Sequence, residues 1–124
     1  MSTAINFCEV SGPDAGALRS FYGDVLGLDV QAPDETGYAM VPPRDGTLGG
    51  GIWDASSAWP EAETTYAVFY VEVEDVAATV ATAEAAGAKV VIGRREHGPT
   101  ISAHLLDPAG NRIGVYQIAQ APAG

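Results

Sequence analysis

Strand-like and helix-like hydrophobic patterns follow each other twice along the chain. In the first half, TAINFCEV (3–10) has a strand-like pattern and runs into Asp14, and apolar residues then recur at helical spacing up to Gly27. In the second half, TYAVFYVEV (65–73) runs into Asp75, and a second helical pattern ends at Gly87. Asp is a favoured helix N-cap and Gly a favoured residue just after a helix. Each half is therefore predicted to begin with a strand and a helix.

Three further apolar stretches follow each predicted helix. They are LDV (28–30), GYAMV (37–41) and LGGGIW (48–53) in the first half, and AKVVI (88–92), TISAHLL (100–106) and NRIGVY (111–116) in the second. The pattern predicts an α+β fold of two tandem βαβββ modules within a single domain, 1–124. Module 1 is expected at about 3–54, a linker at about 55–64, module 2 at about 65–118 and a C-terminal tail at 119–124.

A half-sheet of this kind cannot bury both of its faces alone. We therefore expect the modules to form an incomplete barrel-like sheet around a cleft, with the helices on the outside. Side chains alternate along a strand, so the uniformly apolar phase of the second strand should pack under a helix. That phase comprises Phe69, Val71 and Val73, and it leaves Val68, Tyr70 and Glu72 for the cleft.

The internal repeat extends this assignment to the first module. Relative to the two helix-initiating aspartates, Phe7 matches Val68 and Glu9 matches Tyr70. On the last strand of each module, Gly51 matches Gly114 and Trp53 matches Tyr116. We expect these positions to line the cleft and bind its ligand: Phe7, Glu9, Gly51, Trp53, Val68, Tyr70, Gly114 and Tyr116.

Charge and composition narrow the classes of partner. Six Lys and Arg residues against sixteen Asp and Glu residues give a net charge of −10, which repels nucleic acids and anionic membranes. Two explanations of the acidity remain open, solubility and a preference for cationic ligands. The sequence has neither a membrane-length apolar run nor a signal peptide, so we expect a soluble cytoplasmic protein. Its single cysteine, Cys8, is expected to be packed.

FYGDVLGL (21–28), the tandem βαβββ pattern and the closing DPAGNRIGVYQ (107–117) together have a recognisable order and spacing. The chain resembles the vicinal oxygen chelate superfamily, which includes glyoxalase I, extradiol dioxygenases, fosfomycin-modifying enzymes and bleomycin-resistance proteins. The resemblance covers about residues 4–118. It implies the fold above, and many of the proteins it resembles are homodimers, so we expect a homodimer. It does not select one activity, because this fold hosts many.

The resemblance also implies where a metal would bind. The ligand positions of metal-dependent members fall on Phe7, Gly51, Val68 and Gly114, and none of these side chains can coordinate a metal. We therefore expect no metal and no other cofactor in this cleft. A relocated divalent-metal site stays open as an alternative, and its candidate ligands are Glu9, Glu72, His97 and His104.

Aromatic rings and one carboxylate remain as candidate chemistry in the cleft. Rings stack on planar ligands and attract cations, and Trp59 on the linker is a candidate lid. The first hypothesis is a bleomycin-resistance-like protein that binds a small aromatic compound without a metal, and the acidity leaves open that this compound is cationic. The second is an enzyme, a lyase, isomerase or dioxygenase-type protein of the glyoxalase superfamily. It would use Glu9 as catalytic base or a relocated metal.

Overall fold

The computed structural model describes residues 4–119, so part of the expected tail, 120–124, lies outside the described residues. The fold is mixed α+β, as predicted, with two α-helices and seven strands in the described range. The chain divides into two compact units. We call Asn6–Val68 the N-terminal unit, and Phe69–Gly124 with Met1–Ile5 the C-terminal unit.

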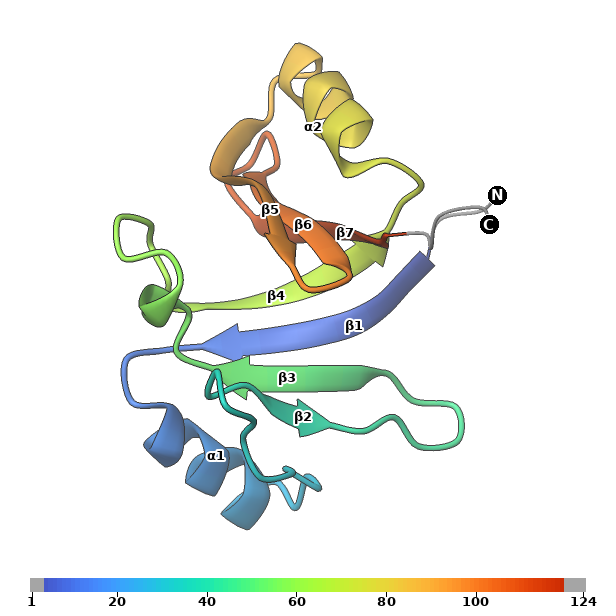
Figure 1. Cartoon of the computed structure of the whole chain (residues 1–124). Coiled ribbons are helices and arrows are strands. Elements are labelled where there is room, and N and C mark those ends of the chain that lie inside the picture. The colour runs from blue at the N-terminus through green and yellow to red at the C-terminus, as the bar shows by residue number, and fades with distance from the viewer. Residues whose placement is uncertain (1–3, 120–124) are drawn as a thin grey trace. The chain divides into compact units, whose positions relative to one another are not determined.

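The N-terminal unit orders its strands β2-β3-β1 (Figure 1). β1 (Ala4–Ser11) pairs in parallel with β3 (Gly49–Trp53), and β2 (Ala39–Val41) pairs antiparallel with β3. Between β1 and β2 comes α1 (Ala15–Asp24), which packs against β3. A short 3₁₀ helix, η1 (Ala55–Ser57), follows β3 at the start of the expected linker.

The strand expected at 28–30 is wrong, because these residues form a loop instead. The backbone has already turned at Gly27, whose φ is +72°, and Leu28 is 44% exposed. The Val30 amide donates to the Leu28 carbonyl, a tight turn that a strand cannot contain. Just after this segment the Gln31 amide donates to the Met40 carbonyl of β2 at 2.9 Å, but Pro33 and the turn at Asp34 follow before a strand can extend.

The C-terminal unit contains the complete βαβββ pattern. Its strand order is β4-β7-β6-β5 (Figure 1). β4 (Tyr66–Glu72), whose last four residues belong to this unit, pairs in parallel with β7 (Arg112–Ile118). β6 (Thr100–Leu106) pairs antiparallel with both β7 and β5 (Lys89–His97). α2 (Val76–Ala85) packs against β5, β6 and β7.

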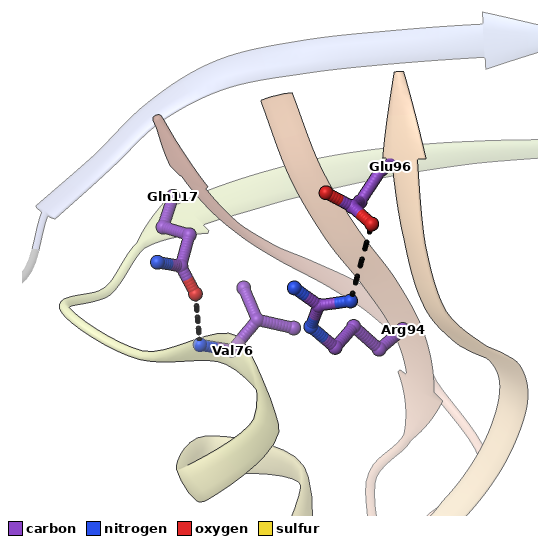
Figure 2. A network of polar contacts seen from close by, with 4 residues as sticks. All are labelled: Val76, Arg94, Glu96 and Gln117. Carbon is purple, nitrogen blue, oxygen red and sulfur yellow. Dashed lines mark hydrogen bonds and ion pairs between the residues drawn. The ribbon is translucent and has the colours of Figure 1, made fainter. Parts of the chain in front are cut away.

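An apolar core lies under α2 in this unit. It consists of Val73, Val76, Ile101, Ala103 and Val115, with Val71 and Val80 packed against it. The Val76 amide at the first turn of α2 donates to the Gln117 side-chain oxygen on β7 at 2.6 Å, which fixes the helix start over the sheet (Figure 2). The prediction that the apolar side chains of this strand pack under a helix is therefore correct for Val71 and Val73. It is wrong for Phe69, which is 38% exposed.

Both helices begin at the predicted Asp N-caps and end shortly before the predicted glycines, with Val25 and Ala86 as C-caps. The Asp14 carboxylate accepts from the Ala17 amide and the Asp75 carboxylate from the Ala78 amide, each at 3.0 Å. Gly27 and Gly87 adopt positive φ values of 72° and 99° just beyond the helix ends, a conformation that glycine adopts at low cost. Within residues 4–119, neither helix is long and apolar enough to cross a membrane.

The expectation that Cys8 is packed is wrong, because its side chain is exposed. Along β1 the buried positions are Glu9 and Ser11, so Cys8 points to the opposite face of the strand. The buried side chains of β1 are thus the polar ones, Glu9 and Ser11, and the Cys8 thiol lies on the surface.

Candidate functional site

The two halves of the chain use the same strand register at the positions matched by the repeat. Glu9 on β1 lies beside Gly51 on the parallel strand β3. Tyr70 on β4 lies beside Gly114 on the parallel strand β7. Each candidate metal position on a last strand is thus a glycine next to a polar residue of the neighbouring strand.

A tyrosine ring fills the space above Gly51. A Cβ atom built on Gly51 would lie 2.0 Å from the Tyr38 hydroxyl oxygen and 2.2 Å from two of its ring atoms. Real Cβ atoms do not approach other atoms so closely, so any side chain at position 51 would displace Tyr38. The glycine is required for this close approach of the ring.

Gly114 has the same relation to Tyr70. A Cβ atom at position 114 would lie 2.4 Å from two ring atoms of Tyr70. The space that a ligating side chain would need at each of these two positions is therefore occupied by a phenol ring. Glycine at 51 and 114 serves the packing of Tyr38 and Tyr70.

Glu9 is 5% exposed, and both of its carboxylate oxygens accept from phenol groups. The Tyr38 hydroxyl donates to Oε1 at 2.6 Å, and the Tyr66 hydroxyl donates to Oε2 at 2.5 Å. All three residues belong to the N-terminal unit, and we call them the carboxylate–phenol group. Burial, and then the charge of Glu9, raise the pKa of Tyr38 well above its ordinary value, so Tyr38 stays a donor.

A folded turn positions Tyr38 just before β2. Asp34 Oδ1 accepts from the amides of Thr36 and Tyr38, at 2.8 and 3.1 Å, and from the Thr36 hydroxyl at 2.6 Å. These bonds lower the pKa of Asp34, and the hydrogen bond from the Thr36 side chain has the largest effect. Gly37 has a φ of +84°, which completes the turn and directs the chain into β2.

Two tryptophan rings extend the aromatic contacts of Tyr38 within the same unit. The ring centroids of Tyr38 and Trp53 lie 5.2 Å apart, and those of Trp53 and Trp59 lie 5.5 Å apart at right angles. Trp53 and Trp59 are 6% and 8% exposed. Trp59, the candidate lid, is therefore a packed partner of Trp53.

An open, largely apolar pocket of about 490 Å³ lies in the N-terminal unit beside Tyr66. Its lining comes from the end of β1, the first half of α1 and residues 65–67. Tyr66 is the member of the carboxylate–phenol group in this lining, and Val10 and Ala67, which also line the pocket, belong to the strand phases opposite Glu9 and Tyr66.

A second buried polar group belongs to the C-terminal unit, and we call it the Tyr70 triad. The Tyr70 hydroxyl lies 2.5 Å from His104 Nε2, and Arg112 Nη1 lies 3.1 Å from His104 Nδ1. His104 is 1% exposed, and burial followed by the Arg112 charge lowers its pKa to about 3. His104 is therefore a neutral imidazole with both ring nitrogens in polar contacts.

The two candidate histidines of a relocated metal site lie apart on the β5–β6 hairpin. His97 lies opposite Thr100 at the end of the β5–β6 hairpin, whereas His104 lies opposite Ile92 further along. His97 is exposed. Residues 4–119 contain no group of three or more His, Cys, Asp or Glu side chains suited to hold a metal ion. A cationic guanidinium beside His104 also disfavours a metal ion there.

The remaining expected ligand-binding residues are Phe7, Val68 and Tyr116. Phe7 on β1 lies opposite Gly49 on β3 in the N-terminal unit. Val68 belongs to the same unit and is 5% exposed. Tyr116 belongs to the C-terminal unit, where its ring centroid lies 6.0 Å from that of Tyr70.

Sequence reasoning missed Tyr38, Tyr66 and Arg112. Tyr66 was within reach, because it precedes Val68 by two residues on the same strand phase. Tyr38 precedes β2 and is placed by the Asp34 turn, so strand alternation gives no signal for it. Arg112 acts through a contact with His104 on the neighbouring strand, which sequence spacing alone does not predict.

Solved structures with similar folds come from several bacteria. An NAD-dependent benzaldehyde dehydrogenase from Legionella pneumophila has a TM-score of 0.65 at 14% identity, covering 91% of this chain and 98% of its own. A glyoxalase/bleomycin resistance protein/dioxygenase superfamily member from Vibrio splendidus has a TM-score of 0.60 at 16% identity, with coverages of 94% and 99%. Streptomyces coelicolor methylmalonyl-CoA epimerase has a TM-score of 0.58 at 18% identity, covering 100% of both chains.

At these identities the structural likeness shows the fold alone. A search of curated proteins found no match. The profile of the Glyoxalase/Bleomycin resistance protein/Dioxygenase superfamily matches residues 4–115, nearly the whole chain. The resemblance read from FYGDVLGL and DPAGNRIGVYQ is thus confirmed, and the chain belongs to the Glyoxalase/Bleomycin resistance protein/Dioxygenase superfamily.

Proposed function

We propose that the protein binds a small, planar, cationic compound at the carboxylate–phenol group, without needing a metal. The observation that carries this proposal is the Glu9 carboxylate, buried to 5% exposure and held on both oxygens by the hydroxyls of Tyr38 and Tyr66. An ionised carboxylate oxygen has more than one acceptor site, so each oxygen can accept a further bond from a ligand. A cation supplies the donors and the charge that such a site prefers.

The distribution of charge supports a cationic ligand. Residues 6–68 contain ten acidic and two basic side chains, and the rest of the chain contains six acidic and four basic ones. Most of the net charge of −10 thus belongs to the unit that contains Glu9. Such a field raises the local concentration of cations and their association rate.

The aromatic residues supply the planar part of the proposed recognition. Tyr38 connects the carboxylate to Trp53, and Trp53 packs against Trp59. An aromatic ring face attracts a cation by about 0.5–2 kcal/mol and also stacks on a planar ligand.

The proposal is tested by thermal shift with benzamidinium and benzamide, a planar cation and its neutral counterpart. Benzamidinium should stabilise the protein saturably, by about 2.7 kcal/mol at a hundredfold excess over its dissociation constant, and benzamide should bind more weakly. Glu9→Gln should weaken benzamidinium binding about ten- to a hundredfold, because a charge-assisted hydrogen bond is lost.

The matched control is Glu61→Gln, which removes the same charge from an exposed position in the same unit. It should leave benzamidinium affinity within about a factor of two, as expected for a screened surface charge. Equal effects of Glu9→Gln and Glu61→Gln would reduce the result to net charge and contradict the site. Equal binding of benzamide and benzamidinium would contradict the cationic ligand class.

A second candidate is a metal-free isomerase or lyase that uses Glu9 as base. The observation that favours it is the same buried carboxylate, whose phenol partners provide hydroxyls next to a candidate base. In a screen of carbon acids for deuterium exchange from heavy water, an active compound should lose about 10²-fold or more in rate with Glu9→Gln. Binding without any exchange supports the first proposal over this one.

A further inference from the structure

The start of α1 lacks two side chains that pack beneath the start of α2. With the repeat aligned on the two helix-initiating aspartates, Gly12 takes the position of Val73. In the same alignment Ala15 takes the position of Val76. Val73 and Val76 are core residues beneath α2, at 8% and 0% exposure. None of the ten α1 residues, all of them described, is buried.

The pocket of about 490 Å³ lies at this place in the N-terminal unit. Gly12 and Leu18 both line it. A Cβ atom built on Gly12 would lie 3.2 Å from Leu18 Cδ1, so Leu18 takes up part of the space that a larger residue would fill. Val10, Ala17 and Ala67 supply further apolar walls. The volume lies within the range of small-molecule sites, about 300–1,000 Å³.

One carboxylate borders these apolar walls. Asp14 is the charged residue of the lining, and its Oδ1 accepts from the Ala17 amide at 3.0 Å. That bond holds the carboxylate at the first turn of α1, next to a residue that also lines the pocket. A carboxylate has acceptor sites beyond the one that the helix uses. The surrounding unit contains ten acidic and two basic side chains, so it attracts cations and repels anions.

We propose that this pocket binds a small aliphatic ammonium compound, with its alkyl part against the apolar walls and its charged nitrogen at Asp14. The alkyl part would occupy the space that valine side chains fill at the start of α2. The ammonium group supplies donors and a charge that a carboxylate accepts. Although Tyr66 belongs to both sets of residues, this site differs from the carboxylate–phenol group, because Val10 lies on the face of β1 opposite Glu9.

The first test is calorimetric titration with cyclohexylmethylammonium and its neutral counterpart, cyclohexylmethanol. The ammonium should bind saturably, about tenfold or more tightly than the alcohol. Asp14→Asn keeps an N-cap acceptor but removes the charge, so it should weaken the ammonium about tenfold while the helix stays formed. Asp75→Asn makes the same change at α2 and should leave the affinity unchanged. Equal binding of the two probes, or equal effects of the two variants, would overturn the site.

A second pair of variants tests the apolar walls. Ala17 and Ala78 each stand three residues after an N-cap, and both are exposed. Leucine is nearly as good a helix former as alanine, so Ala17→Leu should fill the pocket without disturbing α1. It should weaken both probes about tenfold, whereas Ala78→Leu should change neither affinity. Unchanged binding to Ala17→Leu would overturn the location of the site.

A label on the single cysteine shows where the probe binds. Cys8 is exposed on the same face of β1 as Val10, about 7 Å away along the strand. A trifluoroethylthio label on Cys8 should therefore change its ¹⁹F shift saturably with cyclohexylmethylammonium. Glu9→Gln should leave the midpoint of that change unaltered, and Asp14→Asn should move it to higher concentration. An unresponsive label would overturn this location, and a midpoint that depends on Glu9 alone would assign the probe to the carboxylate–phenol group instead.

Discussion

At the scale of single residues, two glycines and two tyrosines shape the buried polar groups of this member of the superfamily. Gly51 and Gly114 stand where metal-dependent relatives are expected to carry ligands, and the rings of Tyr38 and Tyr70 take that space. The hydroxyl groups of these rings then make different contacts. Tyr38 meets a carboxylate, and Tyr70 meets a neutral imidazole.

Gly114→Ala tests whether the Tyr70 ring needs the glycine. The new methyl group would overlap the ring at 2.4 Å, so the variant should lose stability. Overpacking typically costs about 1–3 kcal/mol. Gly93→Ala on β5 is the control, because a Cβ there meets nothing within 4 Å. Urea unfolding should show a loss only for Gly114→Ala, and equal losses would contradict the packing role.

His104 should make stability depend on pH. Its pKa is about 3 when folded, against 6.5 for an ordinary histidine, so the unfolded chain binds the extra proton first as pH falls. The stability that the neutral ring contributes is complete above pH 6.5 or so and is lost progressively toward pH 3. Its slope approaches about 1.4 kcal/mol per pH unit.

Comparing the parent with His104→Gln isolates this effect, because other groups titrate alike in both. Denaturant unfolding from neutral pH to about pH 4.5 should cost the parent about 2 kcal/mol more than the variant. Parallel pH profiles would show that His104 is not held neutral by the fold.

At the scale of elements, much of the fold could be predicted because its signals are local. The Asp N-caps, the glycines after the helices and seven strand segments follow from periodicity and capping chemistry. The segment 28–30 could not be assigned, since three apolar letters do not show whether a partner strand is present. Tyr38 was missed for a related reason, because the Asp34 turn, and not a strand phase, places it.

Asp75→Ala tests the N-cap of α2. The Asp75 carboxylate accepts from the Ala78 amide at 3.0 Å, so the alanine variant leaves that donor unmatched. The expected loss is about 1 kcal/mol in the free energy of unfolding. Asp75→Asn keeps an acceptor oxygen and should lose only a few tenths of a kcal/mol, or about none. Equal losses from both variants would indicate that the charge matters and the hydrogen bond does not.

At the scale of the whole molecule, exposed apolar residues gather at the end of α1 and in the loop after it. Phe21, Val25 and Leu26 are 51%, 63% and 57% exposed, and Leu28 is 44% exposed. Contiguous exposed apolar surface commonly marks an interface. The expected homodimer therefore remains our proposal, with this segment of the N-terminal unit as a contact surface.

Light scattering at micromolar concentration should give the mass of a dimer. The double variant Val25→Ser, Leu26→Ser should shift the population toward the monomer, because it removes apolar area from the contact. Val90→Ser on β5, a position 37% exposed in the C-terminal unit, should not shift it. A monomeric parent protein would contradict the dimer. A double variant that stays dimeric would contradict the contact surface.

The central claim is that the N-terminal unit recognises a planar cation through Glu9 with no metal required. Calorimetric titration of chelator-treated protein with benzamidinium tests it most directly, with Glu9→Gln beside the parent. We predict saturable binding to the parent without added metal, and a loss of about tenfold or more in the variant. Binding that appears only after a divalent metal is restored, or that is the same in both proteins, would contradict the account.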